Sequence, residues 1–208
     1  MEEYKLTHEE ICKIFPDYIG TYNERTFAWN KIKNRLKDKN ILIDMFQYLG
    51  EGSKGKVFQI NSDTVLKVTD DNTEVDAGYI IMNNPTEDIV NIKDLFGIWV
   101  TSSYYRYIII EEKLETPSTE WMKFADDYDG DTTLKHYKKY VKKISSKEKE
   151  QDKHKLLWLK RVCEYMDKFG IVFGDIHYKN IMRREKHPVL IDVGYITGVN
   201  KQPYEWIE

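Results

Sequence analysis

Residues 49–57 read Leu-Gly-Glu-Gly-Ser-Lys-Gly-Lys-Val, with glycines at positions 50, 52 and 55. Glycine has no Cβ, so a glycine-rich turn can bring its backbone N–H groups close to phosphate oxygens. A dinucleotide fingerprint has similar spacing but needs a helix directly after the third glycine. Here residues 56–60, Lys-Val-Phe-Gln-Ile, have the composition of a strand. The stretch therefore predicts a strand–turn–strand phosphate loop, with a flexible hairpin as the plainer alternative.

In the rest of the chain, the spacing of apolar residues changes from helical to strand-like and back. Residues 1–40 have helical spacing, with a capping box at Thr7 to Glu10. Short β-branched or aromatic runs follow, and later a helical stripe at 154–169 ends at Gly170. Strands are expected at 46–50, 56–60, 64–69, 89–96 and 104–111, a helix at 73–82, and a hairpin at 181–184 and 189–192. Strands first and helices later predict an α+β fold of two lobes.

Length and composition exclude several classes of protein. With 208 residues, 41% hydrophobic and 32% charged, the chain suits a soluble globule. Its net charge of −3 argues against a general nucleic-acid binder. No apolar run is long enough to span a membrane, and the first residues lack a signal peptide. Cys12 and Cys163 fit no disulfide framework or zinc pattern, so we expect a cytoplasmic protein.

Lys67 lies inside the apolar run Val65-Leu66-Lys67-Val68. In a strand, Lys67 would share a face with Val65, and its ammonium could reach phosphate oxygens. Taken alone, a lysine that protects an edge strand from aggregation is the more common explanation. An acidic partner should position a phosphate-binding lysine. Glu74 in the following helix is the first choice and Asp76 the substitute.

Two polar segments near the end of the chain can carry chemistry. Residues 173–182 place Asp175 and Asn180 five positions apart in one loop. A carboxylate there could accept a hydroxyl proton, while the amide oxygen could ligate a metal. Residues 189–194 form an apolar strand that ends in Asp192 before a glycine, a position suited to holding Mg²⁺. Singly, each aspartate could instead be a turn residue or a helix cap.

The order of these elements resembles the protein-kinase-like superfamily. The resemblance covers residues 46–194 and implies a sheet-rich N-lobe at 46–111, a truncated helical C-lobe at 112–208, and a helical extension at 1–45. It implies ATP and Mg²⁺ as cofactors. The loop Gly174-Asp175-Ile176-His177 looks like that of aminoglycoside and choline kinase relatives and of RIO-type atypical kinases, with Phe173 where the former have histidine.

The resemblance also implies a role for each candidate residue. Asp175 would act on the acceptor hydroxyl, Lys67 would pair with the phosphates, and Glu74 would position Lys67. Ile110 would guard the back of the adenine pocket, and the backbone of Glu111 and Lys113 would meet adenine. The glycines and a following valine would cover the nucleotide, and two oxygen ligands would hold Mg²⁺; these residues are Gly50, Gly52, Gly55, Val57, Asn180 and Asp192.

The departures from the family pattern shape the functional hypothesis. The usual His-Arg-Asp is replaced by residues 173–175, so no arginine is present to read a phosphorylated activation loop. Fourteen residues follow Gly194, which is too few for a peptide-binding platform. We therefore predict a minimal serine/threonine protein kinase, acting on a protein substrate or docking partner. A small-molecule kinase and an ATP-binding pseudokinase scaffold stay as alternatives.

Four further features have plainer explanations. Residues 135–155 carry nine lysines and three acids, most simply a solvated surface, with contact to an acidic partner as the alternative. Residues 127–131 alternate acids, but Thr132 and Lys138 stand where a calcium loop needs glycine and glutamate. His177 fits contact with the acceptor, orientation of the loop aspartate or a structural hydrogen bond. Cys163 is expected in the core.

Overall fold

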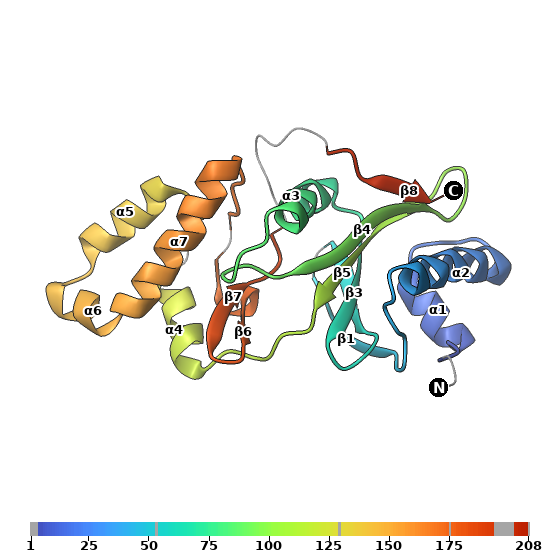
Figure 1. Cartoon of the computed structure of the whole chain (residues 1–208), viewed down its shortest axis with the longest axis horizontal. Helices are drawn as coiled ribbons and strands as arrows, with labels where there is room; N and C mark the ends of the chain where they lie inside the picture. The colour runs from blue at the N-terminus through green and yellow to red at the C-terminus, as the bar shows by residue number, and fades with distance from the viewer. Residues whose placement is uncertain (1–3, 53, 129, 175, 194–201, 208) are drawn as a thin grey trace. The chain divides into compact units, whose positions relative to one another are not determined.

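The computed structural model describes residues 4–52, 54–128, 130–174, 176–193 and 202–207 (Figure 1). The chain divides into two compact units. The first contains Met1–Asn72, Ile92–Lys113 and Pro203–Glu208, and the second contains Thr73–Asn91 and Leu114–Gln202. The fold is α+β, as predicted from the order of the elements. None of the helices in the described ranges is both long and apolar enough to cross a membrane.

A six-stranded sheet forms most of the first unit. Its strand order is β1-β2-β3-β5-β4-β8, antiparallel except for the parallel pair β4 and β8. The bounds of the strands are β1 Gln47–Glu51, β2 Gly55–Gln59, β3 Thr64–Thr69, β4 Ile92–Trp99, β5 Tyr105–Glu112 and β8 Glu205–Ile207. The five strands expected from the sequence are present, within one to three residues of their predicted bounds. The last strand, β8, was not predicted.

Two helices precede the sheet in the chain. They are α1 (His8–Ile14) and α2 (Tyr22–Asp38), and each begins with a capping box, at Thr7 and Thr21 respectively. In both caps the threonine hydroxyl accepts from the backbone of a glutamate three residues later, whose carboxylate accepts in return. The structure confirms the first cap as predicted, and the second uses the same chemistry.

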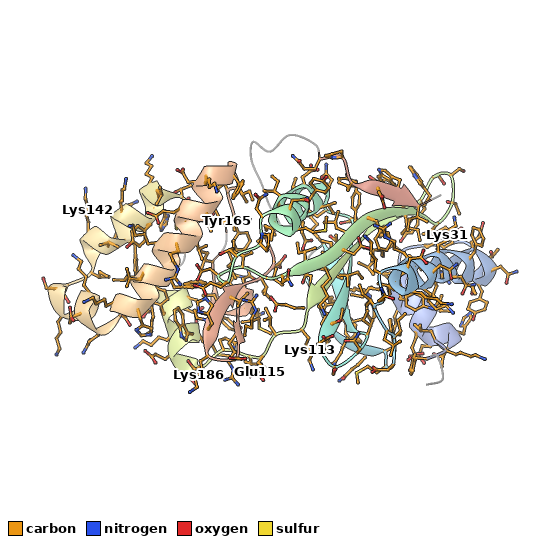
Figure 2. All side chains as sticks on the ribbon, viewed as in Figure 1. Lys31, Lys113, Glu115, Lys142, Tyr165 and Lys186 are labelled. Carbon is orange, nitrogen blue, oxygen red and sulfur yellow. The ribbon has the colours of Figure 1, made fainter. Side chains whose placement is uncertain are left out.

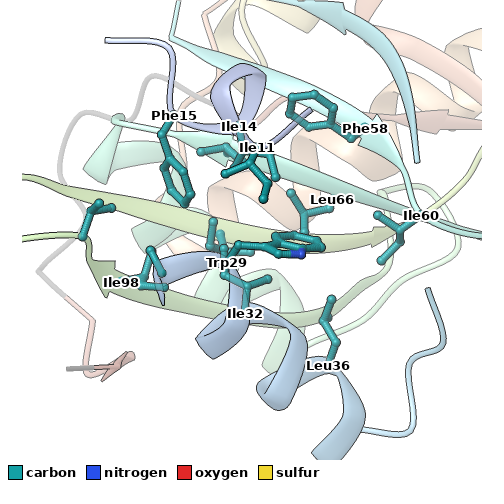
Figure 3. Close-up of a cluster of buried hydrophobic side chains, with 14 of the residues drawn as sticks. Ile11, Ile14, Phe15, Trp29, Ile32, Leu36, Phe58, Ile60, Leu66 and Ile98 are labelled. Carbon is teal, nitrogen blue, oxygen red and sulfur yellow. The ribbon is translucent and has the colours of Figure 1, made fainter. Parts of the chain in front are cut away.

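One hydrophobic core joins these helices to the sheet (Figure 3). The helices contribute Phe15, Trp29 and Leu36, and the sheet contributes Phe58 and Leu66 among others, all at most 2% exposed. The segment at 1–45 is therefore built into the core of the first unit, where it covers one face of the sheet.

A buried ion pair reinforces the same contact. Arg35 of α2 donates two hydrogen bonds, of 2.8 and 3.0 Å, to the carboxylate of Asp94 in β4. It also donates to Glu205 of β8, at 2.5 Å. Asp94 is only 3% exposed, so its charge depends on this guanidinium for compensation. Hydrogen bonding to Asp94 raises the pKa of Arg35 further above its ordinary value.

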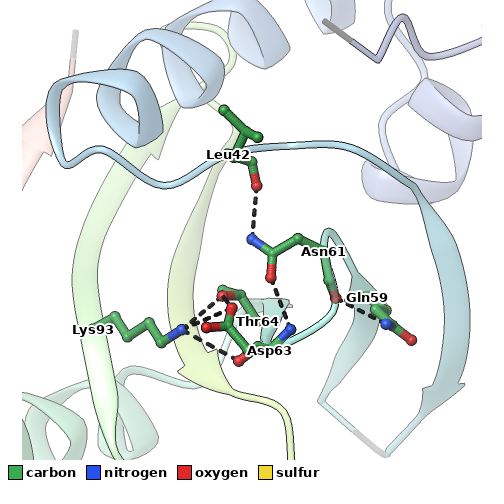
Figure 4. Close-up of polar contacts among 6 residues, drawn as sticks. All are labelled: Leu42, Gln59, Asn61, Asp63, Thr64 and Lys93. Carbon is green, nitrogen blue, oxygen red and sulfur yellow. Dashed lines mark hydrogen bonds and ion pairs between the residues drawn. The ribbon is translucent and has the colours of Figure 1, made fainter. Parts of the chain in front are cut away.

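The turn between β2 and β3 is held by side chains (Figure 4). Asn61 accepts from the backbone of Asp63 at 3.0 Å and donates to the carbonyl of Leu42 at 2.7 Å. Lys93 of β4 donates to the Thr64 hydroxyl at 2.7 Å. The turn at 61–63 thus ties the connection after α2 to the sheet.

The second unit is mainly helical. Its helices are α3 (Asn72–Asn83, from Thr73 on), α4 (Thr119–Tyr128), α5 (Leu134–Lys143), α6 (Ser146–Gln151) and α7 (Lys153–Phe169). Gly170 ends α7 in the left-handed conformation, φ 67°, as its position in the sequence predicted. Cys163 is fully buried on α7, and burial raises the pKa of its thiol to about 12, which confirms it as a core residue. The helices at 119–151 were not predicted, because their sequence is polar and lacks a long apolar stripe.

A two-stranded hairpin completes this unit. Its strands are β6 (Ile181–Arg184) and β7 (His187–Leu190). The predicted hairpin is confirmed, although the second strand begins two residues earlier because the turn contains only Glu185 and Lys186. Residues 89 and 90, expected to begin a strand of the large sheet, instead lie beside Leu190, which exchanges backbone hydrogen bonds with Asp88 and Val90. That pairing explains why β4 starts only at Ile92.

Two residues of α2 provide a stability test of the shared core. Ile32 is fully buried, whereas Phe27 on the same helix is 60% exposed. Ile32→Ala should lower the free energy of unfolding by about 2–5 kcal/mol, because it removes buried methyl groups and leaves a cavity. Phe27→Ala should lower it by less than about 1 kcal/mol. Urea unfolding followed by tryptophan fluorescence measures both, and equal losses would contradict a core that includes α2.

Candidate active site

Lys67 lies in the interior of the sheet. Its strand, β3, pairs with β2 on one side and β5 on the other. Lys67 stands directly across from Val57 of β2 and Ile109 of β5, so these three side chains share one face. It is only 9% exposed. An edge-protecting role is therefore excluded, and Val57 lies where the sequence prediction needs it, beside the lysine.

The opposite face of the same strands is committed to the core of the first unit. Leu66 pairs with Ile110, and both belong to the hydrophobic cluster that includes α1 and α2. The structure thus places Ile110, expected to guard the back of the adenine pocket, on the face opposite to Lys67. A strand reverses its face at every residue, so Ile109, one position earlier, lies on the face of Lys67.

The end of β5 was expected to offer the backbone of Glu111 and Lys113 to adenine, but the structure uses part of it within the sheet and a turn. The backbone N–H of Lys113 donates to the carbonyl of Asp63 at 2.8 Å, within the β2–β3 turn. That N–H is therefore already used and cannot donate to a base in this conformation. Glu111 pairs with Val65 of β3 and with Ile92 of β4, so its backbone lies within the sheet.

The glycine-rich turn connects β1 and β2, as predicted. The backbone N–H of Gly52 donates to the carbonyl of Gly55 at 2.9 Å and closes the turn. A Cβ at Gly55 would lie 2.7 Å from the carbonyl oxygen of Val68, so glycine is needed there for the close approach of β2 and β3. At Gly50 and Gly52 a Cβ would meet nothing within 4 Å. The backbone at these two positions thus borders open space.

Leu49 is a candidate that the sequence reasoning did not single out. The register of β1 shifts between Tyr48 and Gly50, which places Leu49 in a bulge next to the residue opposite Val57. Its side chain is 46% exposed, which is unusual for a leucine in a strand. The signal in the sequence that could have identified Leu49 was an aliphatic residue directly before the first glycine.

The two acids proposed to position Lys67 both lie on α3, in the second unit. Glu74 is 3% exposed and lies in the first turn of the helix. Asp76 is 7% exposed and accepts a hydrogen bond from the backbone N–H of Gln202 at 2.9 Å. Lys67 belongs to the first unit, and the role of either acid toward it stays a prediction.

The loop expected to carry catalysis is anchored by the segment after α4. The backbone of Thr132 donates to the carbonyl of Phe173 at 2.9 Å, and its hydroxyl accepts from the backbone of Phe173 at 3.0 Å. Ile176 donates to the carbonyl of Gly130 at 3.0 Å. Thr132 is 1% exposed. These bonds hold the loop on both sides of position 175, and Asp175 itself lies outside the described residues.

Asn180 and Asp192 are brought together by the hairpin. Ile181 pairs with Leu190, and the backbone of Ile191 donates to the carbonyl of Asn180 at 2.8 Å, one step beyond the last paired residues. Asp192 therefore follows directly after this pair at the open end of the hairpin. Asn180 is 7% exposed. The structure thus places the two predicted oxygen ligands at one end of a single element.

Asp192 has an unusual backbone conformation. Its φ is +54°, in the left-handed region that costs free energy for a residue with a Cβ. The other non-glycine residues with positive φ in the described chain, Asn40 and Glu185, lie after a helix and in a two-residue turn. Positive φ at Asp192 marks a position that the surrounding structure holds against its preference.

His177 has a structural role in this loop. Its Nδ1 accepts from the backbone of Lys179 at 3.1 Å and caps the short 3₁₀ turn Tyr178–Asn180. An accepting Nδ1 leaves the ring proton of a neutral imidazole on Nε2. Of the alternatives left open for His177, the structural hydrogen bond is the one that the described residues contain.

Comparisons with known proteins give similarity in structure but not in sequence. No family model matches the chain, and no curated protein matches it. Among solved structures, aminoglycoside phosphotransferase APH(4)-Ia matches with 14% identity over 42% of this chain and 30% of its own, at a TM-score of 0.31. A MAP kinase from Leishmania major matches with 11% identity over 81% of this chain and 51% of its own, at 0.43.

A third match is aminoglycoside phosphotransferase APH(2″)-IIa, solved in a complex with streptomycin and ATP. It is 16% identical over 79% of this chain and 71% of its own, at a TM-score of 0.37. This chain spans about a third of the first phosphotransferase and about half of the MAP kinase. Phosphotransferases and protein kinases are the proteins that the sequence motifs resemble. Because these TM-scores lie below 0.5, the function is argued from the residues of this chain.

The glycine turn offers a matched pair of variants. Gly55→Ala should destabilise the protein by about 1–3 kcal/mol, because its methyl group would overlap the backbone of β3. Gly52→Ala should change the free energy of unfolding by less than about 1 kcal/mol, because the space there is open. Thermal unfolding of both variants measures the difference. A larger loss for Gly52→Ala would contradict the described turn.

The Thr132 hydroxyl should control the order of the loop. Thr132→Val removes the acceptor for the buried N–H of Phe173, at a cost of about 1–3 kcal/mol, whereas Thr132→Ser keeps it. Hydrogen exchange at the Phe173 amide should therefore be faster in the valine variant and near wild type in the serine variant. Unchanged exchange in Thr132→Val would contradict this anchoring role.

Proposed function

We propose that this protein is an ATP-dependent phosphotransferase that moves the γ-phosphoryl group of ATP to a hydroxyl. The observation that carries this proposal is the convergence of Asn180 and Asp192 at one end of the β6–β7 hairpin. An amide and a carboxylate in that order, after a loop with an aspartate, are the metal ligands of a kinase catalytic centre. The positive φ of Asp192 adds support, because strained backbone gathers at functional positions.

The first unit supplies the groups for the nucleotide. In the proposal, the turn covers the phosphates with no side chain in the way at Gly50 and Gly52, and Gly55 keeps the turn close to β3. Lys67 pairs with phosphate oxygens from the interior of the sheet, positioned by Glu74. Val57, Ile109 and Leu49 supply apolar surface for the base, with Ile109 in place of the Ile110 expected from the sequence.

The donor set fits a magnesium ion. Mg²⁺ prefers hard oxygen ligands, and the side chains of Asn180 and Asp192 both offer oxygen. When bound with the nucleotide, Mg²⁺ neutralises charge on the β- and γ-phosphates. The hairpin fixes the backbone of both ligands, so little ordering is left to occur on binding.

Asp175 is assigned to the acceptor hydroxyl. An ordinary aspartate has a pKa near 3.9, so it is a weak base toward an alcohol. It would therefore orient the hydroxyl oxygen for in-line attack and take the proton late, as the bond to phosphorus forms. Thr132 and Gly130 hold the segments on both sides of this position by hydrogen bonds to Phe173 and Ile176.

The proposal also concerns which kind of hydroxyl accepts the phosphoryl group. We favour a serine or threonine hydroxyl of a protein, because a protein acceptor brings its own binding surface. The loop sequence Gly174-Asp175-Ile176-His177 favours the alternative, a small-molecule hydroxyl, since it resembles that of aminoglycoside kinases. An ATP-binding scaffold without turnover is the third possibility, and the presence of Lys67, Asn180 and Asp192 argues against it.

A labelling assay tests the proposal. The purified chain with Mg-ATP labelled at the γ-position should transfer label to itself or to proteins of a mixed extract. Lys67→Ala and Asp192→Asn should each reduce transfer by about a hundredfold or more, since each removes a charge from the phosphates or the metal. Lys37→Ala is the matched control, because Lys37 is exposed on α2 and belongs to no part of the candidate site.

Each alternative has its own outcome in this assay. Label on a metabolite instead of a protein would identify a small-molecule kinase. A thermal shift with Mg-ATP but no transfer would identify a scaffold. Near-normal transfer by Lys67→Ala or Asp192→Asn would refute the assigned roles.

A further inference from the structure

A stripe of lysines covers one side of α5 in the second unit. The stripe consists of Lys135, Lys138, Lys139, Lys142 and Lys143, which recur every three or four residues and are all exposed. This spacing places them on one face of the helix. Figure 2 shows Lys142 extending away from the ribbon at this helix.

These lysines have no partner within the described part of the chain. None of the five takes part in a hydrogen bond or ion pair there. The neighbouring Lys155 of α7 is the contrast, because it is 5% exposed and contacts Glu120 at 2.7 Å and Asp152 at 2.6 Å. The fold therefore pairs the lysine that it buries and leaves the stripe to solvent.

The stripe opposes the stability of its own helix. Residues 134–143 contain no acid, so every charged pair at i,i+3 or i,i+4 within α5 is repulsive. Lys135 lies in the first turn, where the helix dipole disfavours a positive charge. Only Lys142 and Lys143, in the last turn, suit the dipole. The charges thus contribute little to the folded state and are available to a partner.

The charge of the chain is unevenly distributed. Residues 135–155 carry nine lysines and three acids, a net +6, so the remaining residues sum to −3 − 6 = −9. A long polyanion such as duplex nucleic acid would extend from the stripe onto this acidic remainder. A compact anionic segment avoids that repulsion. With ten residues, α5 is about 15 Å long, which an extended peptide of about five residues matches.

A membrane surface fits less well. Interfacial helices place large apolar side chains in the headgroup region beside their basic residues. None of the exposed large hydrophobic residues of the described chain lies on α5. The apolar side of the helix is half-buried and packs against α4 and α7, with ring contacts from Tyr140 to Phe124 and Tyr128 of α4.

We propose that the lysine stripe of α5 is a docking surface for a short acidic segment of a partner protein. Carboxylates of that segment pair with two or more lysines of the stripe, and the affinity comes mainly from electrostatic attraction. This surface does not depend on the proposed phosphotransfer, because no residue of the stripe belongs to the candidate active site.

Binding of an acidic peptide to the full chain tests this surface. The probe is a fluorescein-labelled hexapeptide of alternating Glu and Asp, followed by anisotropy. Affinity should fall clearly between about 50 and 200 mM salt, because exposed charges are screened. A double variant, Lys138→Glu with Lys142→Glu, should bind at least about tenfold more weakly.

The matched control is Lys123→Glu with Lys186→Glu. Both of these lysines are exposed, and the pair changes the net charge by the same amount, so affinity should change less than about twofold. Far-ultraviolet circular dichroism verifies that both variants are folded. An equal loss in the two variants, or wild-type binding no tighter than to a neutral Gly-Ser peptide, would overturn the proposal. Tighter binding of duplex DNA or of anionic vesicles than of the peptide would also overturn it.

Discussion

The register of β3 between β2 and β5 governs the candidate active site on the first unit. This strand is buried along its whole length, so each of its side chains is committed to one face or the other. One face joins the core beneath α1 and α2, and the other carries Lys67 with Val57 and Ile109. A slip of one residue would exchange the two sets and place a lysine in the hydrophobic core. The same rule shows why Ile110 cannot share the surroundings of Lys67.

On the second unit, backbone pairing has the corresponding role. A short hairpin brings Asn180 and Asp192 to one end, although twelve positions separate them in the sequence. The segment at 130–132 holds the preceding loop by hydrogen bonds to its backbone. These contacts fix the backbone on which the polar residues stand.

The sequence predicted much of this arrangement. Glycine spacing, apolar alternation around Lys67 and the cap at Thr7 act locally, so the strands, turns and first helices could be inferred from them. The face of Ile110 and the use of the Lys113 N–H depend on pairing between distant strands, which no local pattern reports. Helices α4 to α6 escaped prediction because their sequence is polar and lacks a long apolar stripe. Strand β8 is only three residues long and pairs with a strand more than a hundred residues earlier.

The placement of β8 has a consequence for synthesis of the chain. Residues 203–208 return to the first unit only after the whole second unit has emerged from the ribosome. Until then, the outer edge of β4 has no neighbouring strand, and Arg35 has only one of its two carboxylate partners. An uncovered edge can pair with other chains. The first unit is therefore completed last, and its nascent form is the stage most exposed to aggregation.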